Sequence, residues 1–161
     1  MKKIEMVDLW SQYERLKADI DNAISGVISS AAFINGPDKR LFEEELQRYL
    51  GNRHVIACGN GTDALQIAMM ALGLKPGDEV ITTNFTFIAT VEVIELLGLK
   101  AVLAEPDYGT FNISIEAIRR AITPRTRAIV PVHLFGQCAD MEPILELARQ
   151  HEIHVIEDAA Q

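Results

Sequence analysis

The stretch Val155-Ile156-Glu157-Asp158-Ala159-Ala160-Gln161 stands last in the sequence, and in it a short apolar run passes directly into an acidic pair. An apolar run of this kind predicts a strand. In an open α/β sheet, ligands bind beyond the carboxyl ends of the strands, so a carboxylate placed there is directed at a site. Asp158 is therefore the first candidate for a binding residue. The alternative is a solvated aspartate at a strand end or a helix cap.

Upstream of this stretch, β-rich runs alternate with segments that carry apolar residues at helical spacing. The predicted strands cover residues 55–58, 79–83, 101–104, 128–132 and 155–156. The predicted helices between them cover residues 63–72, 87–97, 115–122 and 141–151. Crossover helices of this size imply mainly parallel strands with right-handed connections. The pattern therefore predicts the α/β class, with three layers built on a mainly parallel sheet.

Two amphipathic helices are predicted before the first strand, at residues 9–31 and 38–50. The segment Phe33-Ile34-Asn35-Gly36-Pro37 separates them, and Gly51 ends the second. We interpret residues 1–51, approximately, as an N-terminal arm laid on the domain or on another subunit. The domain itself then covers about residues 52–161, in which we find no linker, low-complexity tract or repeat.

The composition predicts a globular protein, because 48% of the 161 residues are apolar and 24% are charged. The formal net charge of -8 and the pI near 5.0 argue against a nucleic-acid partner, since no segment concentrates basic residues. We find no signal-peptide core and no apolar run of membrane-spanning length. We therefore expect a cytoplasmic protein without a membrane partner.

Cysteine and histidine usage predicts no metal site. Cys58 and Cys138 lie far apart and lack the short spacing of zinc or redox sites. We expect both to be small buried apolar groups. No ligand spacing is found among the histidines, His54, His133, His151 and His154.

The turn Gly59-Asn60-Gly61-Thr62 follows a predicted strand and opens a predicted helix. Free N–H groups and the positive end of the helix dipole meet there beside a hydroxyl, which favours an anion such as phosphate. The alternative is that the glycines serve backbone geometry alone. The glycine spacing fits neither a P-loop nor a dinucleotide fingerprint, which disfavours an ordinary nucleotide-binding protein.

Aromatic and polar side chains follow two other predicted strands. We expect Phe85 to cap the core, whereas Phe87 could cap the core or offer a flat surface to a planar ligand. We favour a satisfied buried hydrogen bond for His133 over a place in a cleft. A phosphate cradle, a stacking face and a buried carboxylate together describe a site for a planar, phosphorylated, nitrogen-containing ring.

Several motifs occur together and in order along the chain, namely Phe33-Ile34-Asn35-Gly36-Pro37, Asn60-Gly61-Thr62-Asp63-Ala64-Leu65, Pro76-Gly77-Asp78-Glu79-Val80-Ile81, Thr86-Phe87-Ile88-Ala89-Thr90, Ala121-Ile122-Thr123-Pro124-Arg125-Thr126, Pro131-Val132-His133 and Glu157-Asp158-Ala159-Ala160-Gln161. With these motifs the chain resembles the amino-terminal part of the DegT/DnrJ/EryC1/StrS sugar aminotransferases, pyridoxal-phosphate (PLP) enzymes of fold type I. The resemblance implies an incomplete PLP-binding major domain of that fold, without the small carboxy-terminal domain.

The resemblance also implies how pyridoxal 5'-phosphate would be held. Backbone groups of Gly61 and Thr62, with the Thr62 hydroxyl, would bind the phosphate, and Phe87 would stack on the pyridine ring. Asp158 would pair with the pyridine nitrogen, where a carboxylate keeps that nitrogen protonated. Gln161 would hydrogen-bond the ring hydroxyl.

Transamination needs a lysine that forms a Schiff base with the coenzyme. In the family that lysine lies in a motif that would follow well after the position of Gln161, and none of the six lysines of this sequence has the motif's neighbours. We therefore assign no catalytic residue. We expect the chain to be a truncated piece that is inactive alone, in which residues 55–58 form a strand that lacks a neighbour or leaves an exposed edge.

For the parent protein the resemblance implies amino transfer from glutamate to a keto group of a nucleotide-linked sugar. The similarity points to a UDP-3-keto-N-acetylhexosamine uronate, used in cell-surface polysaccharide or secondary-metabolite biosynthesis, and to a homodimer. The alternative is a non-catalytic regulatory or scaffold module that retains the aminotransferase fold.

Overall fold

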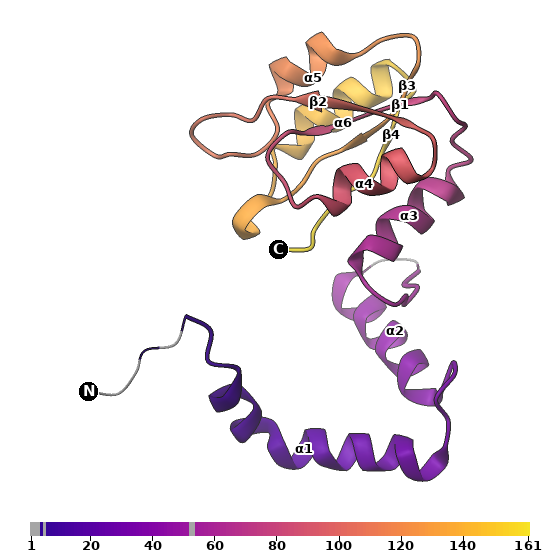
Figure 1. Cartoon of the computed structure of the whole chain (residues 1–161), viewed down its shortest axis with the longest axis vertical. Helices are drawn as coiled ribbons and strands as arrows, with labels where there is room; N and C mark the ends of the chain where they lie inside the picture. Colours follow the sequence, from indigo (N-terminus) through magenta and orange to yellow (C-terminus); the bar gives the residue numbers. More distant parts are fainter. Residues whose placement is uncertain (1–3, 5, 52–53) are drawn as a thin grey trace. The chain divides into compact units, whose positions relative to one another are not determined.

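The computed structural model describes residue 4 and residues 6–51 and 54–161 of the chain (Figure 1). The chain divides into two compact units, and the boundary between them falls between Ala57 and Cys58. The predicted binding residues all belong to the second unit.

The first unit contains helices α1 (Leu9–Ser30) and α2 (Pro37–Leu50), which confirms the two helices predicted from apolar spacing. The Asp8 carboxylate caps α1 by accepting the Ser11 N–H at 3.0 Å. Helix α2 begins at Pro37, which lacks a backbone N–H. Proline is tolerated at this position because the first N–H groups of a helix have no acceptor within the helix. Gly51 ends α2 in the left-handed region (φ 67), where a residue with a side chain would be strained. Within the described part of this unit, neither helix contains a buried residue.

The second unit is built on a parallel sheet whose described strands follow the order β2-β1-β3-β4. The strands are β1 (Glu79–Thr83), β2 (Lys100–Ala104), β3 (Thr126–Val130) and β4 (His154–Val155). The helices are α3 (Gly61–Ala71), α4 (Ala89–Leu96), α5 (Ile115–Ala121) and α6 (Met141–Gln150), with a 3₁₀ turn η1 (Leu134–Gly136). The predicted α/β class and the parallel strand direction are confirmed.

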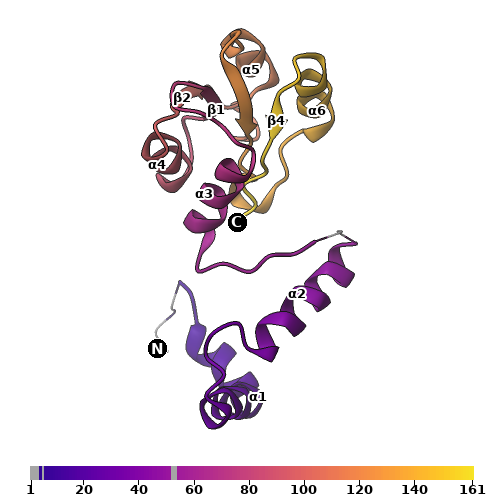
Figure 2. The same cartoon turned by 90° about the vertical axis from the view of Figure 1, so that its right-hand side faces the viewer.

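Helices cover both faces of this sheet, so the unit has three layers (Figure 2). Successive side chains of a strand point to opposite faces. Val80 of β1 accordingly packs in the cluster formed with α3 and α4, and Ile81 packs in the cluster formed with α5 and α6. All five residues of β1 are buried, as expected for a strand that pairs on both sides, whereas the edge strand β2 is mostly accessible.

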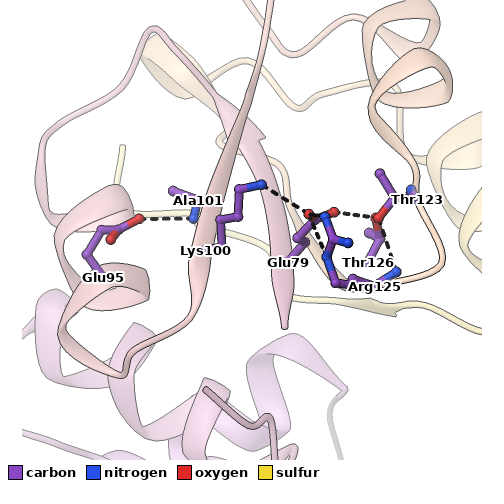
Figure 3. A network of polar contacts seen from close by, with 7 residues as sticks. All are labelled: Glu79, Glu95, Lys100, Ala101, Thr123, Arg125 and Thr126. Atoms are coloured by element: carbon purple, nitrogen blue, oxygen red, sulfur yellow. Dashed lines mark hydrogen bonds and ion pairs between the residues drawn. The ribbon is translucent and has the colours of Figure 1, made fainter. Parts of the chain in front are cut away.

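A buried carboxylate, Glu79, joins elements at the amino end of β1 (Figure 3). Arg125 donates to Glu79 Oε1 from Nη2 (2.6 Å) and Nε (3.1 Å), and the Thr123 hydroxyl donates to Oε2. Lys100 Nζ lies 3.3 Å from Oε1. The hydrogen bonds from Thr123 and then Arg125 lower the pKa of Glu79 from 4.5 to about 2. The carboxylate thereby connects the amino ends of β1 and β2 with the turn before β3.

The strand predicted at residues 55–58 does not form. This segment has no ladder partner among the described residues, and Ile56 is 79% exposed. Its Ala57 N–H instead donates to the Glu43 carboxylate at 2.8 Å. The expectation that a strand at this position lacks a neighbour stays a prediction, since no strand forms there. A β-rich run becomes a strand only when another strand satisfies its backbone groups, and none does so among the described residues.

The strand predicted at residues 128–132 is shifted to 126–130. Pro131 has no N–H to donate to the ladder, which ends the regular pairing before it. Val132 still forms an isolated parallel bridge with Asp158. The sheet register therefore continues past the ends of β3 and β4 and includes the predicted binding residue.

The prediction that both cysteines are buried is wrong. Cys58 and Cys138 are exposed, because both lie on connecting segments outside the two core clusters. In the described parts of the chain, histidine, cysteine and acidic side chains form no group of three or more that could hold a metal ion. No helix among the described residues combines the length and apolar character needed to span a bilayer.

Candidate functional site

Five predicted binding residues line one cavity of about 330 Å³: Gly61, Thr62, Phe87, Asp158 and Gln161. The other residues that line it are Leu65, Thr86, Ala89, Thr90, Val132 and Ala160. The cavity lies beyond the carboxyl ends of β1, β3 and β4, because its residues follow Thr83, Val130 and Val155 in the sequence. This is the position at which open α/β sheets bind ligands.

The amino end of α3 contributes Gly61 and Thr62 to the cavity. Asn60 caps this helix, since its Oδ1 accepts the Asp63 N–H at 2.9 Å and its backbone oxygen accepts the Ala64 N–H at 3.0 Å. The N–H groups of Gly61 and Thr62 have no hydrogen-bond partner among the described residues. Two donors at the positive end of a helix dipole therefore remain available to an anion.

The Phe87 side chain is 72% exposed on the turn between β1 and α4. It does not cap the core, and the second interpretation, a flat ring offered to a ligand, stays a prediction. The expectation that Phe85 caps the core is wrong. The Phe85 ring lies outside both core clusters and contacts the rings of Phe111 and Phe135, with centroids 5.8 Å and 6.4 Å away.

Asp158 is 8% exposed and is held by the continuation of the sheet. Its N–H donates to the Pro131 carbonyl at 2.9 Å, and its carbonyl accepts the His133 N–H at 3.0 Å. Its Oδ2 accepts the Thr90 hydroxyl at 2.8 Å, and its Oδ1 accepts the Ala160 N–H at the longer distance of 3.3 Å. The backbone of Asp158 is thus fixed on both sides, and its carboxylate lines the cavity.

His133 lies outside the residues that line the cavity and makes the buried hydrogen bond that we favoured for it. Its Nδ1 accepts the Ala139 N–H at 3.1 Å, so the neutral ring carries its proton on Nε2. Nε2 lies 2.9 Å from Glu157 Oε2. With both nitrogens engaged, His133 connects the segments that follow β3 and β4.

The Gln161 side chain is oriented by one hydrogen bond. Its Oε1 accepts the Phe135 N–H at 2.7 Å. The amide oxygen is thereby engaged, and the amide NH₂ group remains as a donor. Gln161 can therefore donate to an oxygen of a ligand in the cavity.

Thr86 and Thr90 also line the cavity, but sequence reasoning assigned them no role. No local pattern signalled this pair, because Thr86 lies in the bend before α4 and only Thr90 lies in the helix. The sequence does not reveal that their hydroxyl groups meet Asp158.

The cavity combines two unpartnered N–H donors, an exposed aromatic ring, a buried carboxylate and an amide donor. No lysine is found among the residues that line it in the described part of the chain. The arrangement fits a flat ring that carries an anionic group at one end and a basic nitrogen at the other.

Comparison with known proteins identifies the relatives of this chain. A sequence model described as the DegT/DnrJ/EryC1/StrS aminotransferase family matches residues 14–161. The UDP-2-acetamido-2-deoxy-3-oxo-D-glucuronate aminotransferase of Pseudomonas aeruginosa is 49% identical over 158 residues, which cover 98% of this chain and 44% of that protein. A protein of Geobacillus stearothermophilus named pleiotropic regulatory protein is 48% identical over 158 residues, or 98% of this chain and 42% of that protein.

Solved structures show the same fold. The crystal structure of Streptomyces venezuelae DesV in complex with a ketimine intermediate matches with a TM-score of 0.97 and 40% sequence identity. That match covers 100% of this chain and 43% of the DesV chain. The chain therefore spans less than half the length of the proteins it matches.

Proposed function

The chain belongs to the DegT/DnrJ/EryC1/StrS aminotransferase family, and from this premise we propose that the cavity of its second unit binds pyridoxal 5'-phosphate. The observation that carries the proposal is the convergence of Gly61, Thr62, Phe87, Asp158 and Gln161 on that cavity. The donors at the start of α3 and the buried carboxylate beyond β4 lie far apart in the sequence, and one flat ligand could contact both.

Each residue offers the coenzyme a different contact. The N–H groups of Gly61 and Thr62 would bind the phosphate, and the ring of Phe87 would cover one face of the pyridine. Asp158 would pair with the ring nitrogen and keep it protonated, while the Gln161 amide would donate to the ring oxygen. When bound, the coenzyme supplies a ring that accepts electrons from the substrate carbon.

We further propose that the complete protein transfers an amino group from glutamate to a keto group of a nucleotide-linked sugar. The name of the Pseudomonas aeruginosa relative, a UDP-linked 3-oxo-glucuronate aminotransferase, supports a UDP-3-keto-N-acetylhexosamine uronate as substrate. The product would serve polysaccharide or secondary-metabolite biosynthesis. We propose a cytoplasmic homodimer, as the family resemblance implies.

An amination assay with the complete gene product tests this proposal. The protein is loaded with pyridoxal 5'-phosphate and incubated with glutamate and a UDP-linked, dTDP-linked or GDP-linked keto sugar. We expect 2-oxoglutarate to form in step with one amino sugar, detected by mass spectrometry. If none of the sugars is aminated, the proposal is contradicted. The 161-residue chain alone is expected to give no product in the same assay, because no lysine lines its cavity within the described residues.

A regulatory role is the second candidate, because one similar protein is named as a pleiotropic regulator. A module that keeps the cavity without the chemistry would bind the coenzyme yet aminate none of the sugars. Coenzyme binding measured by fluorescence, beside the amination assay, separates the two functions.

A further inference from the structure

Two threonines connect to Asp158 through a line of hydroxyl groups. The Thr90 hydroxyl lies 2.8 Å from Asp158 Oδ2, and the Thr86 hydroxyl lies 3.1 Å from the Thr90 hydroxyl. Thr90 is 1% exposed and lies in the first turn of α4, whereas Asp158 lies beyond β4. Both threonines line the cavity.

The direction of this line follows from the chemistry of its members. An ionised carboxylate has no proton to donate, so the Thr90 hydroxyl must donate to Asp158. A hydroxyl has one proton, and that of Thr90 is committed to the carboxylate. The hydrogen bond between the two hydroxyls therefore runs from Thr86 to Thr90.

We propose that Thr90, supported by Thr86, is a positioning residue that holds the Asp158 carboxylate toward the ring nitrogen of the coenzyme. The inference rests on the proposed function above. A hydrogen bond from a buried hydroxyl fixes the orientation of the carboxylate that accepts it. The same hydrogen bond occupies Oδ2. Because Oδ1 accepts the Ala160 N–H at the longer distance of 3.3 Å, it is the oxygen with the greater remaining capacity to accept a hydrogen bond from a ligand.

Loss of the Thr90 hydroxyl would leave Asp158 Oδ2 without its side-chain donor, and a carboxylate that turns away from the ring stabilises a cationic ring nitrogen less. The nitrogen should then lose its proton at a lower pH. Hydrogen bonds to charged groups are strong enough that we expect its proton affinity to fall about tenfold. A residue that only fills space in the core would leave this titration unchanged.

The ring nitrogen can be observed directly with pyridoxamine 5'-phosphate labelled with ¹⁵N in the ring. This form carries an amine instead of an aldehyde, so its binding needs no reactive lysine. It is bound to the complete gene product, and its ¹⁵N chemical shift is followed against pH. In Thr90→Val the nitrogen should lose its proton at a lower pH than in the wild type, and Thr90→Ser should restore the wild-type curve. Thr86→Val should give a smaller shift in the same direction.

Thr82→Val is the matched control. Thr82 is also fully buried, and its hydroxyl donates to the Val130 carbonyl at 2.8 Å, but it does not line the cavity. The same chemical change there should leave the nitrogen titration unchanged. Circular dichroism checks that each variant folds. Thr90→Cys, with a weaker donor of similar size, is the second variant should Thr90→Val not fold, and it should shift the curve in the same direction.

The outcomes distinguish this inference from the proposed function. If Asp158→Asn abolishes protonation of the bound ring and Thr90→Val and Thr90→Cys match the wild type, the inference is overturned while the proposed function stands. If the wild-type protein does not bind the probe, or does not perturb its ring nitrogen, both are overturned.

Discussion

The two ends of the parallel sheet each hold a buried carboxylate, and the two carboxylates differ in their hydrogen-bond partners. Glu79, at the amino end of β1, receives donors from Thr123 and Arg125 and an ion pair from Lys100. Asp158, beyond the carboxyl end of β4, receives one side-chain hydrogen bond and borders a cavity.

This difference is why we assign Glu79 a structural role and propose a functional one for Asp158. The four contacts of Glu79 use the acceptor capacity of both oxygens and join neighbouring elements of the fold (Figure 3). Asp158 keeps acceptor capacity beside a space large enough for a ligand. Burial alone therefore does not identify a site, and the partners of the buried group do.

Asp158→Asn should give the largest effect and leave the fold intact. The substitution keeps the shape of the side chain and removes the charge that would hold the coenzyme nitrogen protonated. The kcat of the complete gene product should fall on the order of 10²–10³-fold, as when one electrostatic stabiliser is lost from an active site. Steady-state kinetics and urea unfolding are measured together. Activity within about tenfold of the wild type would refute the role of Asp158.

Glu79→Gln should show the reverse pattern, with lost stability and retained coenzyme binding. The free energy of unfolding should fall by about 2 kcal/mol, a moderate loss because the exposed Arg125 and Lys100 side chains can regain water. Urea unfolding followed by circular dichroism measures the change. Glu95→Gln is the control, because the exposed Glu95 accepts a single hydrogen bond, from the Ala101 N–H. A similar loss in both variants would contradict the structural role of Glu79.

The smallest predicted effect is the loss, at acid pH, of the stability that Glu79 contributes at the amino end of the sheet. The folded protein holds the pKa of Glu79 at about 2, below its ordinary value of 4.5, so the unfolded chain binds more protons between these values. The stability contributed by Glu79 is complete above about pH 4.5 and is lost as the pH falls toward about 2. Unfolding free energies of wild type and Glu79→Gln, measured at about pH 5 and about pH 3, should therefore converge at the lower pH. A constant difference would disprove this assignment.

Local patterns in the sequence indicated several of the residues that line the cavity. Gly61 and Thr62 follow from the signature of a helix start, and Asp158 follows from its place after an apolar strand. The role of Thr90 did not follow, because its partner Asp158 is 68 residues away. The wrong predictions for residues 55–58 and Phe85 have the same origin, since both depend on neighbours that are distant in sequence.

The sequence alone establishes the alternation of helices and strands, the parallel α/β class and the residues placed at strand ends and helix starts. These features depend on hydrophobic periodicity and capping, which act over a few residues. Only the tertiary structure shows the order of the strands, the lack of a ladder partner for residues 55–58 within the described part of the chain, and the hydroxyl that reaches Asp158. Those features depend on contacts between distant segments, which form when the sheet register and the helix packing bring them together.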